Sequence, residues 1–202
     1  VVAFHIMREH NVLAGLTPVQ YASARKLIIK SILATDMTCH FGLTAELKEC
    51  ATRLSGGSDL EVRALASKMP PADREVLIKT LLHCADISNP CKPWDTSKKW
   101  SDLVCQEFFA QGDREKAEGL PVSPNMDRET TKQAQLSLNF IDFIVAPLFI
   151  AVTNILPLMQ TCVDLLDENR SKWEVELKAT LADEGGESAK EEEEQRWERR
   201  KT

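Results

Sequence analysis

Apolar residues recur along the chain at helical spacings, whereas the alternation typical of half-buried strands is scarce. Residues 17–54 begin with Thr17 as an N-cap and Pro18 in the first helical turn. Apolar positions then follow four or five residues apart, at Ile28, Ile32, Met37 and Phe41. This pattern predicts one long helix or two in sequence, ended by the run SGGSD at residues 55–59.

Two further helices are predicted from their first turns and apolar faces. The run PADREVLIKTLLHCADI begins at Pro71 with acidic residues in its first turn, and Pro90 and Pro93 mark its exit. Its apolar face holds Val76, Leu77, Leu81 and Leu82. The run DTSKKWSDLVCQEFFAQGD is expected to end at Gly112. Its neighbouring turns carry Trp100, Leu103, Val104, Glu107 and Phe108.

The most apolar part of the chain follows a loop, GLPVSPNMD, that is predicted to end in Asp127 as the N-cap of a long helix. Leu136, Phe140, Phe143 and Ile144 belong to that helix. Residues 143–159 come near the lower length limit for a membrane span, but Pro147, Asn154 and Pro157 interrupt them. A kinked core helix is therefore the preferred interpretation, with a membrane span as the alternative.

The composition changes after residue 183, where the sequence becomes DEGGESAKEEEEQRWERRKT. Such charge blocks are typical of a solvated helix or a disordered tail. We therefore predict an all-α fold, a compact multi-helix domain over residues 1–175 followed by a charged tail over residues 184–202.

Composition narrows the function classes. The 202 residues suit one domain, and 43% hydrophobic with 28% charged residues is an ordinary soluble balance. The net charge of −6 argues against a nucleic-acid partner. Six scattered cysteines without a CxxC pair fit a reducing compartment. Because residue 1 is Val, we expect the chain to start inside a larger protein, and a signal peptide can be neither inferred nor excluded.

Several residues could carry chemistry. In HCADISNP (residues 83–90), His83 and Asp86 share a helix face and either bind a metal together or serve packing and capping. Thr35 and Asp36 interrupt an apolar run, and they either line a wet cavity or face solvent. An aromatic wall for a flat ligand, or simply a core stripe, is suggested by Trp100, Val104, Phe108 and Phe140. A Gly-rich phosphate loop, a GxSxG elbow and an HExxH motif are all missing from the sequence.

Taken together, several segments resemble one family in their order and spacing. They are ILATDM, LLHCADISNPCKPW, EFFAQGDREKAEGLPVSP, MDRE and FIDFIVAPLF. They resemble the C-terminal half of the class I cyclic nucleotide phosphodiesterase catalytic domain, over roughly residues 1 to 175. This resemblance implies an all-α partial catalytic domain and hydrolysis of 3′,5′-cyclic nucleotides (cAMP and/or cGMP) to 5′-monophosphates by a two-metal mechanism. It also implies a role in signal transduction.

The resemblance makes Asp86 a ligand of Zn²⁺, with two His and one Asp from upstream completing the site. A second metal, Mg²⁺ or Mn²⁺, is expected beside it, and the two would activate a water for attack on phosphorus. The general-acid His is also expected upstream, because motifs of the HNxxHxxD and HDxxH kind are absent from these 202 residues. We therefore expect little activity from this chain alone. His83 is expected to support the Asp86 turn, Thr35 and Asp36 to order metal-bound waters, and Met37 to lie near the metals.

The resemblance also implies a purine pocket. Phe140 should stack on the ring, Val104 should lie opposite it, and Asn89 should be a polar pocket residue. Three residues before Phe140 the family has a Gln whose amide reads the purine edge, but this chain has Ser137. The shorter side chain should weaken binding by roughly 1–3 kcal/mol.

Two alternatives remain open: a degenerate relative that binds a nucleotide or a partner without hydrolysis, and a helical interaction module that acts through its acidic tail. An upstream regulatory domain and a cytoplasmic location are expected, with any membrane association arising from regions outside this sequence.

Overall fold

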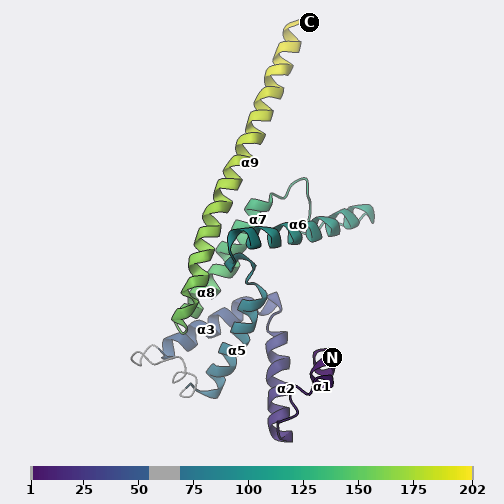
Figure 1. The fold of residues 1–202 in the computed structure, drawn as a ribbon. Helices are drawn as coiled ribbons and strands as arrows, with labels where there is room; N and C mark the ends of the chain where they lie inside the picture. The colour runs from purple at the N-terminus through teal and green to yellow at the C-terminus, as the bar shows by residue number, and fades with distance from the viewer. Residues whose placement is uncertain (1, 55–68, 202) are drawn as a thin grey trace. The chain divides into compact units, whose positions relative to one another are not determined.

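The computed structural model describes the backbone of residues 2–54 and 69–201 and the side chains in these ranges up to residue 183. Within these ranges the regular elements are helical and none is a strand, which confirms the predicted all-α class (Figure 1). The chain divides into two units, residues 1–86 and 87–202. The predicted helix break at SGGSD lies outside the described residues. The predicted boundaries at 175 and 184 stay a prediction.

The first unit contains α1 (Val2–Glu9), α2 (Pro18–Leu33), η1 (Met37–Cys39), α3 (His40–Leu54) and α5 (Pro71–Asp86). As predicted, Thr17 caps α2: its hydroxyl accepts from the backbone N–H of Gln20, and the Gln20 side chain accepts from the Thr17 backbone N–H. Both α2 and α3 pack against α5. The predicted long helix is thus two helices, separated by a turn and η1.

The apolar row predicted across these two helices is not a core stripe in this unit. Ile32 is 47% exposed, Met37 44% and Phe41 67%. The buried face of α3 is formed instead by Leu43, Leu47, Cys50 and Ala51. The break between α2 and α3 changes the rotational register of the second helix. Apolar positions counted continuously from Ile28 therefore no longer fall on the buried face of α3.

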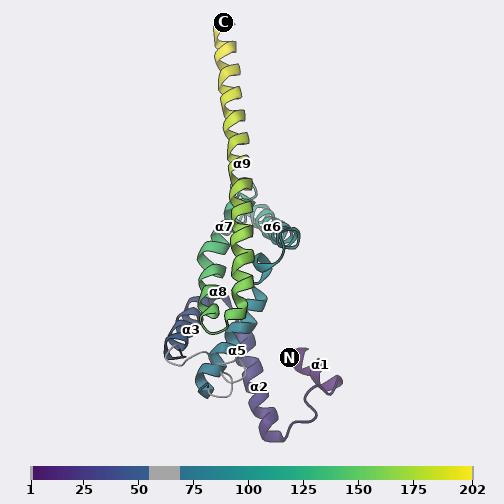
Figure 2. The same ribbon diagram turned by 60° about the vertical axis from the view of Figure 1, so that its left-hand side comes forward.

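The second unit contains η2 (Asn89–Cys91), α6 (Trp94–Ala117), α7 (Gln133–Phe140), η3 (Ile141–Val145), α8 (Ala146–Thr153), η4 (Pro157–Met159) and α9 (Gln160–Lys201). Helices α7 and α8 lie along the first part of α9, and η2 packs against both α6 and α9 (Figures 1 and 2). The backbone of residues 184–201 continues α9, which is the helical form of the two predicted for the tail.

Two predicted helix ends in this unit are wrong. Helix α6 runs through Gly112 to Ala117. Gly112 is buried, and a Cβ there would clash with the backbone oxygen of Met126, so the glycine allows close approach of the following loop instead of ending the helix. Asp127 does not cap α7, whose N-cap is Lys132. Its carboxylate instead accepts from the backbone N–H of Glu129 and from Lys116 Nζ.

The apolar segment after α7 is an interrupted core helix, as predicted. Five π-helical residues, Ile141–Val145, precede α8, in whose first turn Pro147 lies. Proline has no N–H to donate and crowds the preceding turn, which accounts for a widened turn at this point. Residues 133–153 are long and apolar enough to cross a membrane by length and composition. The core helix of a soluble protein passes the same test, and Val145, Leu148 and Val152 are fully buried.

Candidate functional site

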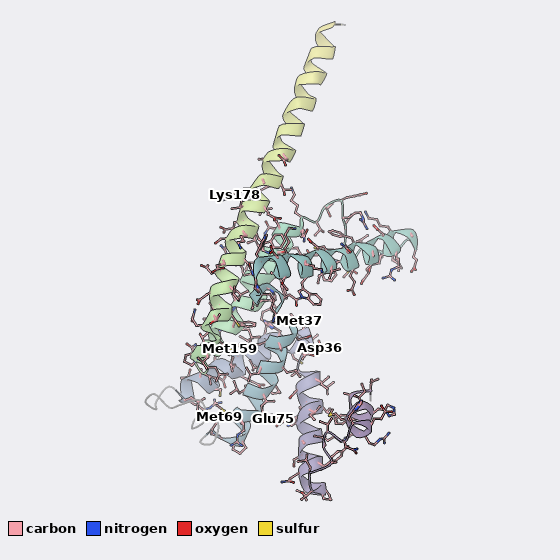
Figure 3. The ribbon with its side chains drawn as sticks, viewed as in Figure 1. Asp36, Met37, Met69, Glu75, Met159 and Lys178 are labelled. Atoms are coloured by element: carbon pink, nitrogen blue, oxygen red, sulfur yellow. The ribbon has the colours of Figure 1, made fainter. Side chains whose placement is uncertain are left out.

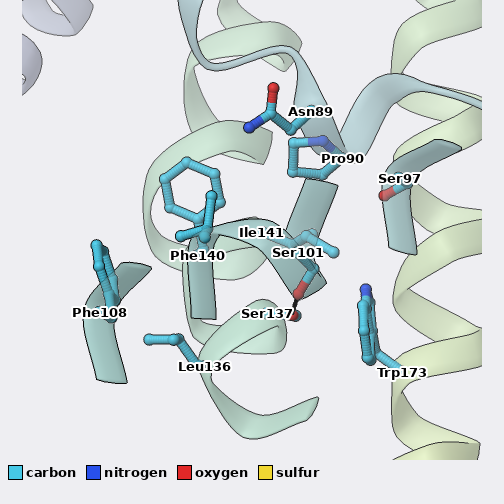
Figure 4. A pocket seen from close by; sticks show the side chains of 11 residues that line it. Asn89, Pro90, Ser97, Ser101, Phe108, Leu136, Ser137, Phe140, Ile141 and Trp173 are labelled. Atoms are coloured by element: carbon cyan, nitrogen blue, oxygen red, sulfur yellow. Dashed lines mark hydrogen bonds between the residues drawn. The ribbon is translucent and has the colours of Figure 1, made fainter. Parts of the chain in front are cut away.

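The second unit holds a pocket of about 200 Å³ between η2, α6, α7 and α9 (Figure 4). Its described lining is Asn89, Pro90, Ser97, Ser101, Val104, Phe108, Leu136, Ser137, Phe140, Ile141 and Trp173. Four of the five residues predicted to bind substrate, Asn89, Val104, Ser137 and Phe140, are therefore brought together here. Their roles in binding stay a prediction.

The apolar walls follow from helical spacing. Val104 and Phe108 are four residues apart on α6, and Leu136 and Phe140 are four apart on α7, so each pair lies on one face of its helix. Three members of the suggested aromatic wall thus line the pocket. Trp100, the fourth, is 48% exposed and is not among the lining residues.

A hydrogen-bonded chain forms the polar end of the pocket. Ser101 Oγ and Ser137 Oγ are 2.9 Å apart (Figure 4). Gln133 Nε2 donates to Ser101 Oγ at 3.0 Å. The same nitrogen donates to Asp102 Oδ1 at 2.7 Å, and Lys98 Nζ donates to that oxygen at 3.2 Å. Hydrogen bonding from Gln133, together with Lys98, lowers the pKa of Asp102, so this carboxylate is ionised at neutral pH.

The segment that carries Asn89 is tied to α9 by one buried amide. Asn169 is 1% exposed, and its Nδ2 donates to the carbonyl oxygens of Pro90 and Lys92, each at 2.7 Å. Buried carbonyls need such partners, because a desolvated polar group left unpaired is costly. One turn further along α9, Trp173 packs edge-on against Trp94 with ring centroids 5.0 Å apart. The α9 helix therefore supplies both a wall of the pocket and the anchor of η2.

The predicted metal ligand lies in the first unit. Asp86 is the last residue of α5, and its side chain is exposed. The C-terminus of a helix carries partial negative charge from its last carbonyls, so a carboxylate there is favourable only beside a cation. A carboxylate is also a suitable ligand for Zn²⁺ or Mg²⁺. Asp86 therefore fits the role of one ligand, although the described residues contain no cluster of three His, Cys, Asp or Glu side chains.

His83 is a core residue of this unit. It is fully buried, and its Nε2 lies 2.9 Å from Nδ1 of the equally buried His40. Its own Nδ1 is buried without a hydrogen-bonding partner among the described residues. Burial lowers the pKa of His83, although the nearby Asp86 carboxylate acts in the opposite direction. The His83–His40 pair thus joins the last turn of α5 to the first residue of α3.

The other predicted residues near the metals cap local structure. The Thr35 hydroxyl donates to the Ile32 carbonyl at 2.8 Å. Asp36, which with Met37 is labelled in Figure 3, is the N-cap of η1 and accepts from both the N–H and the hydroxyl of Thr38. These bonds lower the pKa of Asp36. Asp36 and Met37 are exposed, which agrees with the solvent-facing alternative and leaves a role toward metal-bound water as a prediction.

Sequence reasoning missed Ser101, Gln133 and Trp173. Gln133 carries a usable signal, since it lies four residues before Ser137 and hence on the same face of α7. Ser101 carries a similar signal, since it lies three residues before Val104 on the same face of α6. Trp173 carries none, because it meets the pocket only through the packing of α9.

Comparison with known proteins adds independent evidence. The family described as 3′,5′-cyclic nucleotide phosphodiesterase has a model that matches residues 1–166. The dual specificity calcium/calmodulin-dependent 3′,5′-cyclic nucleotide phosphodiesterase 1B of Mus musculus is 38% identical over 147 residues, which cover 73% of this chain and 25% of that protein. The 3′,5′-cyclic-nucleotide phosphodiesterase regA of Dictyostelium discoideum is 34% identical over 173 residues, which cover 85% of this chain and 21% of that protein.

A solved structure agrees with the sequence comparisons. LmjPDEB1, a Leishmania phosphodiesterase in complex with IBMX, matches with a TM-score of 0.72 and 34% identity. The match covers 83% of this chain and 48% of that one, whereas the chain spans about a quarter of the length of the curated relatives. On the strength of the family match and this shared fold, the chain belongs to the 3′,5′-cyclic nucleotide phosphodiesterase family.

Proposed function

We propose that this chain provides the ring-binding pocket and one metal-binding carboxylate of an enzyme that hydrolyses 3′,5′-cyclic nucleotides, cAMP and/or cGMP, to 5′-monophosphates. The observation that carries the proposal is the pocket itself. Its side walls are apolar and aromatic, and its ends carry an amide at Asn89 and two hydroxyls at Ser101 and Ser137. A flat heterocycle with polar edges has the matching chemistry.

Each lining residue has a part in this proposal. The ring of Phe140 stacks on the purine, and Val104 covers the opposite side. Asn89 is held in place through the Asn169 anchor of its segment and pairs with polar edge atoms. Ser137 stands where a longer amide would read the ring. Base–aromatic stacking contributes on the order of 1–3 kcal/mol, so Phe140 supplies the largest single contribution to affinity.

The first unit holds the metal side of the proposal. Asp86 would bind a divalent cation, Zn²⁺ or its Mg²⁺ or Mn²⁺ companion, from the end of α5. Two such cations supply Lewis-acid activation of water and neutralisation of phosphate charge. The His83–His40 pair keeps the last turn of α5 in position. In this proposal Thr35 and Asp36 order metal-bound water, and Met37 lies near the metals. The general-acid His comes from outside this chain, as does a regulatory domain, and the enzyme works in the cytoplasm.

The pocket is tested by two phenylalanines on neighbouring turns. Phe140 lines the pocket, whereas Phe143 is 67% exposed. Phe140→Ala should weaken binding of cAMP and cGMP by about tenfold, measured by isothermal titration, while Phe143→Ala should leave it unchanged. Equal effects of the two changes would count against the pocket as the binding site.

The carboxylate is tested separately by metal content. Asp86→Asn should reduce the zinc retained by the full-length protein after dialysis and should abolish hydrolysis with Mg²⁺ present. Asp95→Asn, at another exposed aspartate, serves as the control. If full zinc content and turnover survived in Asp86→Asn, the assignment of this ligand would be wrong.

A second candidate function is binding of a cyclic nucleotide without hydrolysis. It is favoured by Ser137, whose hydroxyl is already paired with Ser101. Ser137→Gln discriminates: a large gain in nucleotide affinity indicates an intact pocket, and no gain indicates a pocket that has lost this function.

A further inference from the structure

Two consecutive residues of α9 hold the two segments that border the pocket. Asn169 is bonded to the η2 segment, as described above. Arg170 holds the other segment: its Nε and Nη2 donate to the two carboxylate oxygens of Asp142, at 2.7 and 3.1 Å. Asp142 directly follows Phe140 and Ile141, both of which line the pocket (Figure 4). The guanidinium group therefore ties α9 to the end of the wall that Phe140 forms.

The contact between Arg170 and Asp142 has two points. Two N–H···O bonds fix the plane of the guanidinium group against that of the carboxylate, which a single charged contact does not do. Hydrogen bonds to Asp142 and to Glu174, to which Nη1 donates at 2.6 Å, raise the pKa of Arg170, so it stays charged at neutral pH. The side chains of Arg170 and Asp142 are 39% and 33% exposed, so water screens their attraction. The main effect of the contact is therefore on geometry.

Asp142 lies in the turn where the helix changes its hydrogen-bond pattern. The backbone N–H of Ile141 donates to the carbonyl of Ser137, four residues earlier, as in an α-helix. The N–H of Ala146 donates instead to the carbonyl of Ile141, five residues earlier. This π-helical turn thus holds one residue more than an α turn. If it closed to the α pattern, the helices on its two sides would rotate relative to each other by about 100°.

Such a rotation would move Phe140. Helix α8 is fixed in the core, because Leu148 and Val152 are fully buried, so the rotation would fall on α7. A rotation of about 100° brings a side chain to a different face of its helix, and Phe140 would then leave the pocket wall. Asp142 belongs to the turn that would close, so its carboxylate would rotate away from Arg170. The two-point contact therefore stabilises the π-helical turn over the α pattern.

We infer that Arg170 is a positioning residue for the ring pocket: through Asp142 it stabilises the π-helical turn and so keeps Phe140 in the pocket wall. The inference rests on the proposed function, in which Phe140 stacks on the ring of a cyclic nucleotide. Arg170 is not among the described residues that line the pocket, so its effect on binding passes through Phe140.

Two substitutions break the two-point contact from its two sides. Arg170→Lys keeps the positive charge but not the planar group, and Asp142→Asn keeps the shape of the side chain but only one acceptor oxygen. Each should weaken binding of both cAMP and cGMP to the purified chain by about three- to tenfold in isothermal titration. Glu174→Gln is the matched control: it alters the other partner of Arg170, leaves the contact with Asp142, and should leave the affinity unchanged.

Repeating the titration in Phe140→Ala separates positioning from a general loosening of the fold. Because Arg170 acts through Phe140, Arg170→Lys should cause no further loss of affinity in that background. In the full-length enzyme, Arg170→Lys should raise KM by the same factor and leave kcat unchanged, as expected for a contact made equally in the ground state and the transition state. Tryptophan fluorescence checks that each variant is folded, and Asp142→Asn carries the test if Arg170→Lys is not.

The outcomes are distinguishable. Unchanged affinity in Arg170→Lys and Asp142→Asn, or a loss of equal size in the Phe140→Ala background, overturns the inference and leaves the proposed function intact. Failure of both nucleotides to bind the unmodified chain defeats the proposed function and the inference with it.

Discussion

Replacing Asn169 by aspartate should release the segment that carries one end of the ring pocket. The change preserves the volume of the side chain but replaces its NH₂ group by an oxygen. In the present structure that NH₂ group donates to the carbonyls of Pro90 and Lys92 at 2.7 Å each. In the variant, carboxylate oxygens would face two carbonyl oxygens at a position that is 1% exposed.

The cost can be worked from these contacts. Two hydrogen bonds are lost, each with a net value of about 1 kcal/mol. The carbonyls left unpaired and the buried charge add about 1–3 kcal/mol. We therefore expect Asn169→Asp to reduce the free energy of unfolding of the second unit by roughly 3–5 kcal/mol. Asn139→Asp is the control, because Asn139 is exposed and already acts as an acceptor, from Gln135.

Tryptophan fluorescence in a urea titration measures this unit selectively. All four tryptophans of the sequence, at positions 94, 100, 173 and 197, belong to residues 87–202.

The stability lost in Asn169→Asp should also depend on pH. A carboxyl among carbonyls has a folded-state pKa above its unfolded value of about 3.9, so its deprotonated form opposes folding. The variant should regain stability as the pH falls through the raised pKa, because the protonated group can donate one bond. A loss below about 1 kcal/mol, or one equal at pH 5 and pH 8, would refute this reasoning.

Three further outcomes are expected. Gly112→Ala should reduce stability by about 1–3 kcal/mol in a urea titration, because the new Cβ would meet the Met126 backbone; retention of full stability would contradict the close approach. Gly42→Ala, in a helix with open space around the glycine, should raise stability by about 0.5–1 kcal/mol in the same titration, and a decrease would be unexpected. In alkylation followed by mass spectrometry, exposed Cys39 should react well before Cys105, even at about pH 9, because burial raises the pKa of Cys105; equal rates would show that Cys105 is accessible.

Local chemistry was readable from the sequence wherever a residue acts on its own neighbours. Thr17 and Pro71 mark true helix starts because capping and the fixed backbone angle of proline act within one turn. The predictions for Asp127 and Gly112 were wrong because these residues act on distant parts of the chain. Asp127 pairs with Lys116, eleven residues away, and Gly112 is required by the backbone of the following loop. Such uses depend on tertiary contacts that a local pattern does not contain.

Some residues of the pocket could likewise be predicted from the sequence, and others could not. Val104 with Phe108 could be grouped from helical spacing, and Phe140 could be added from the family resemblance. Gln133 could be placed on the Ser137 face of α7 from its spacing, but its hydrogen bond to Ser101 crosses 32 positions of sequence and depends on the packing of α6 against α7. Trp173 enters from α9, and only helix packing brings it to the pocket. For Asp86 the structure gives an exposed carboxylate at a helix end, and its metal remains a prediction.

The eleven described side chains that line the pocket carry no formal charge. A neutral heterocycle should therefore enter it with little regard to ionic strength, because no counterions have to be displaced. If the proposed function holds, the anionic part of a cyclic nucleotide binds to groups outside this pocket. Raising the salt concentration should thus weaken the binding of the whole nucleotide and leave the binding of its isolated base nearly unchanged. Titrations at several salt concentrations would therefore separate recognition of the ring from recognition of the phosphate.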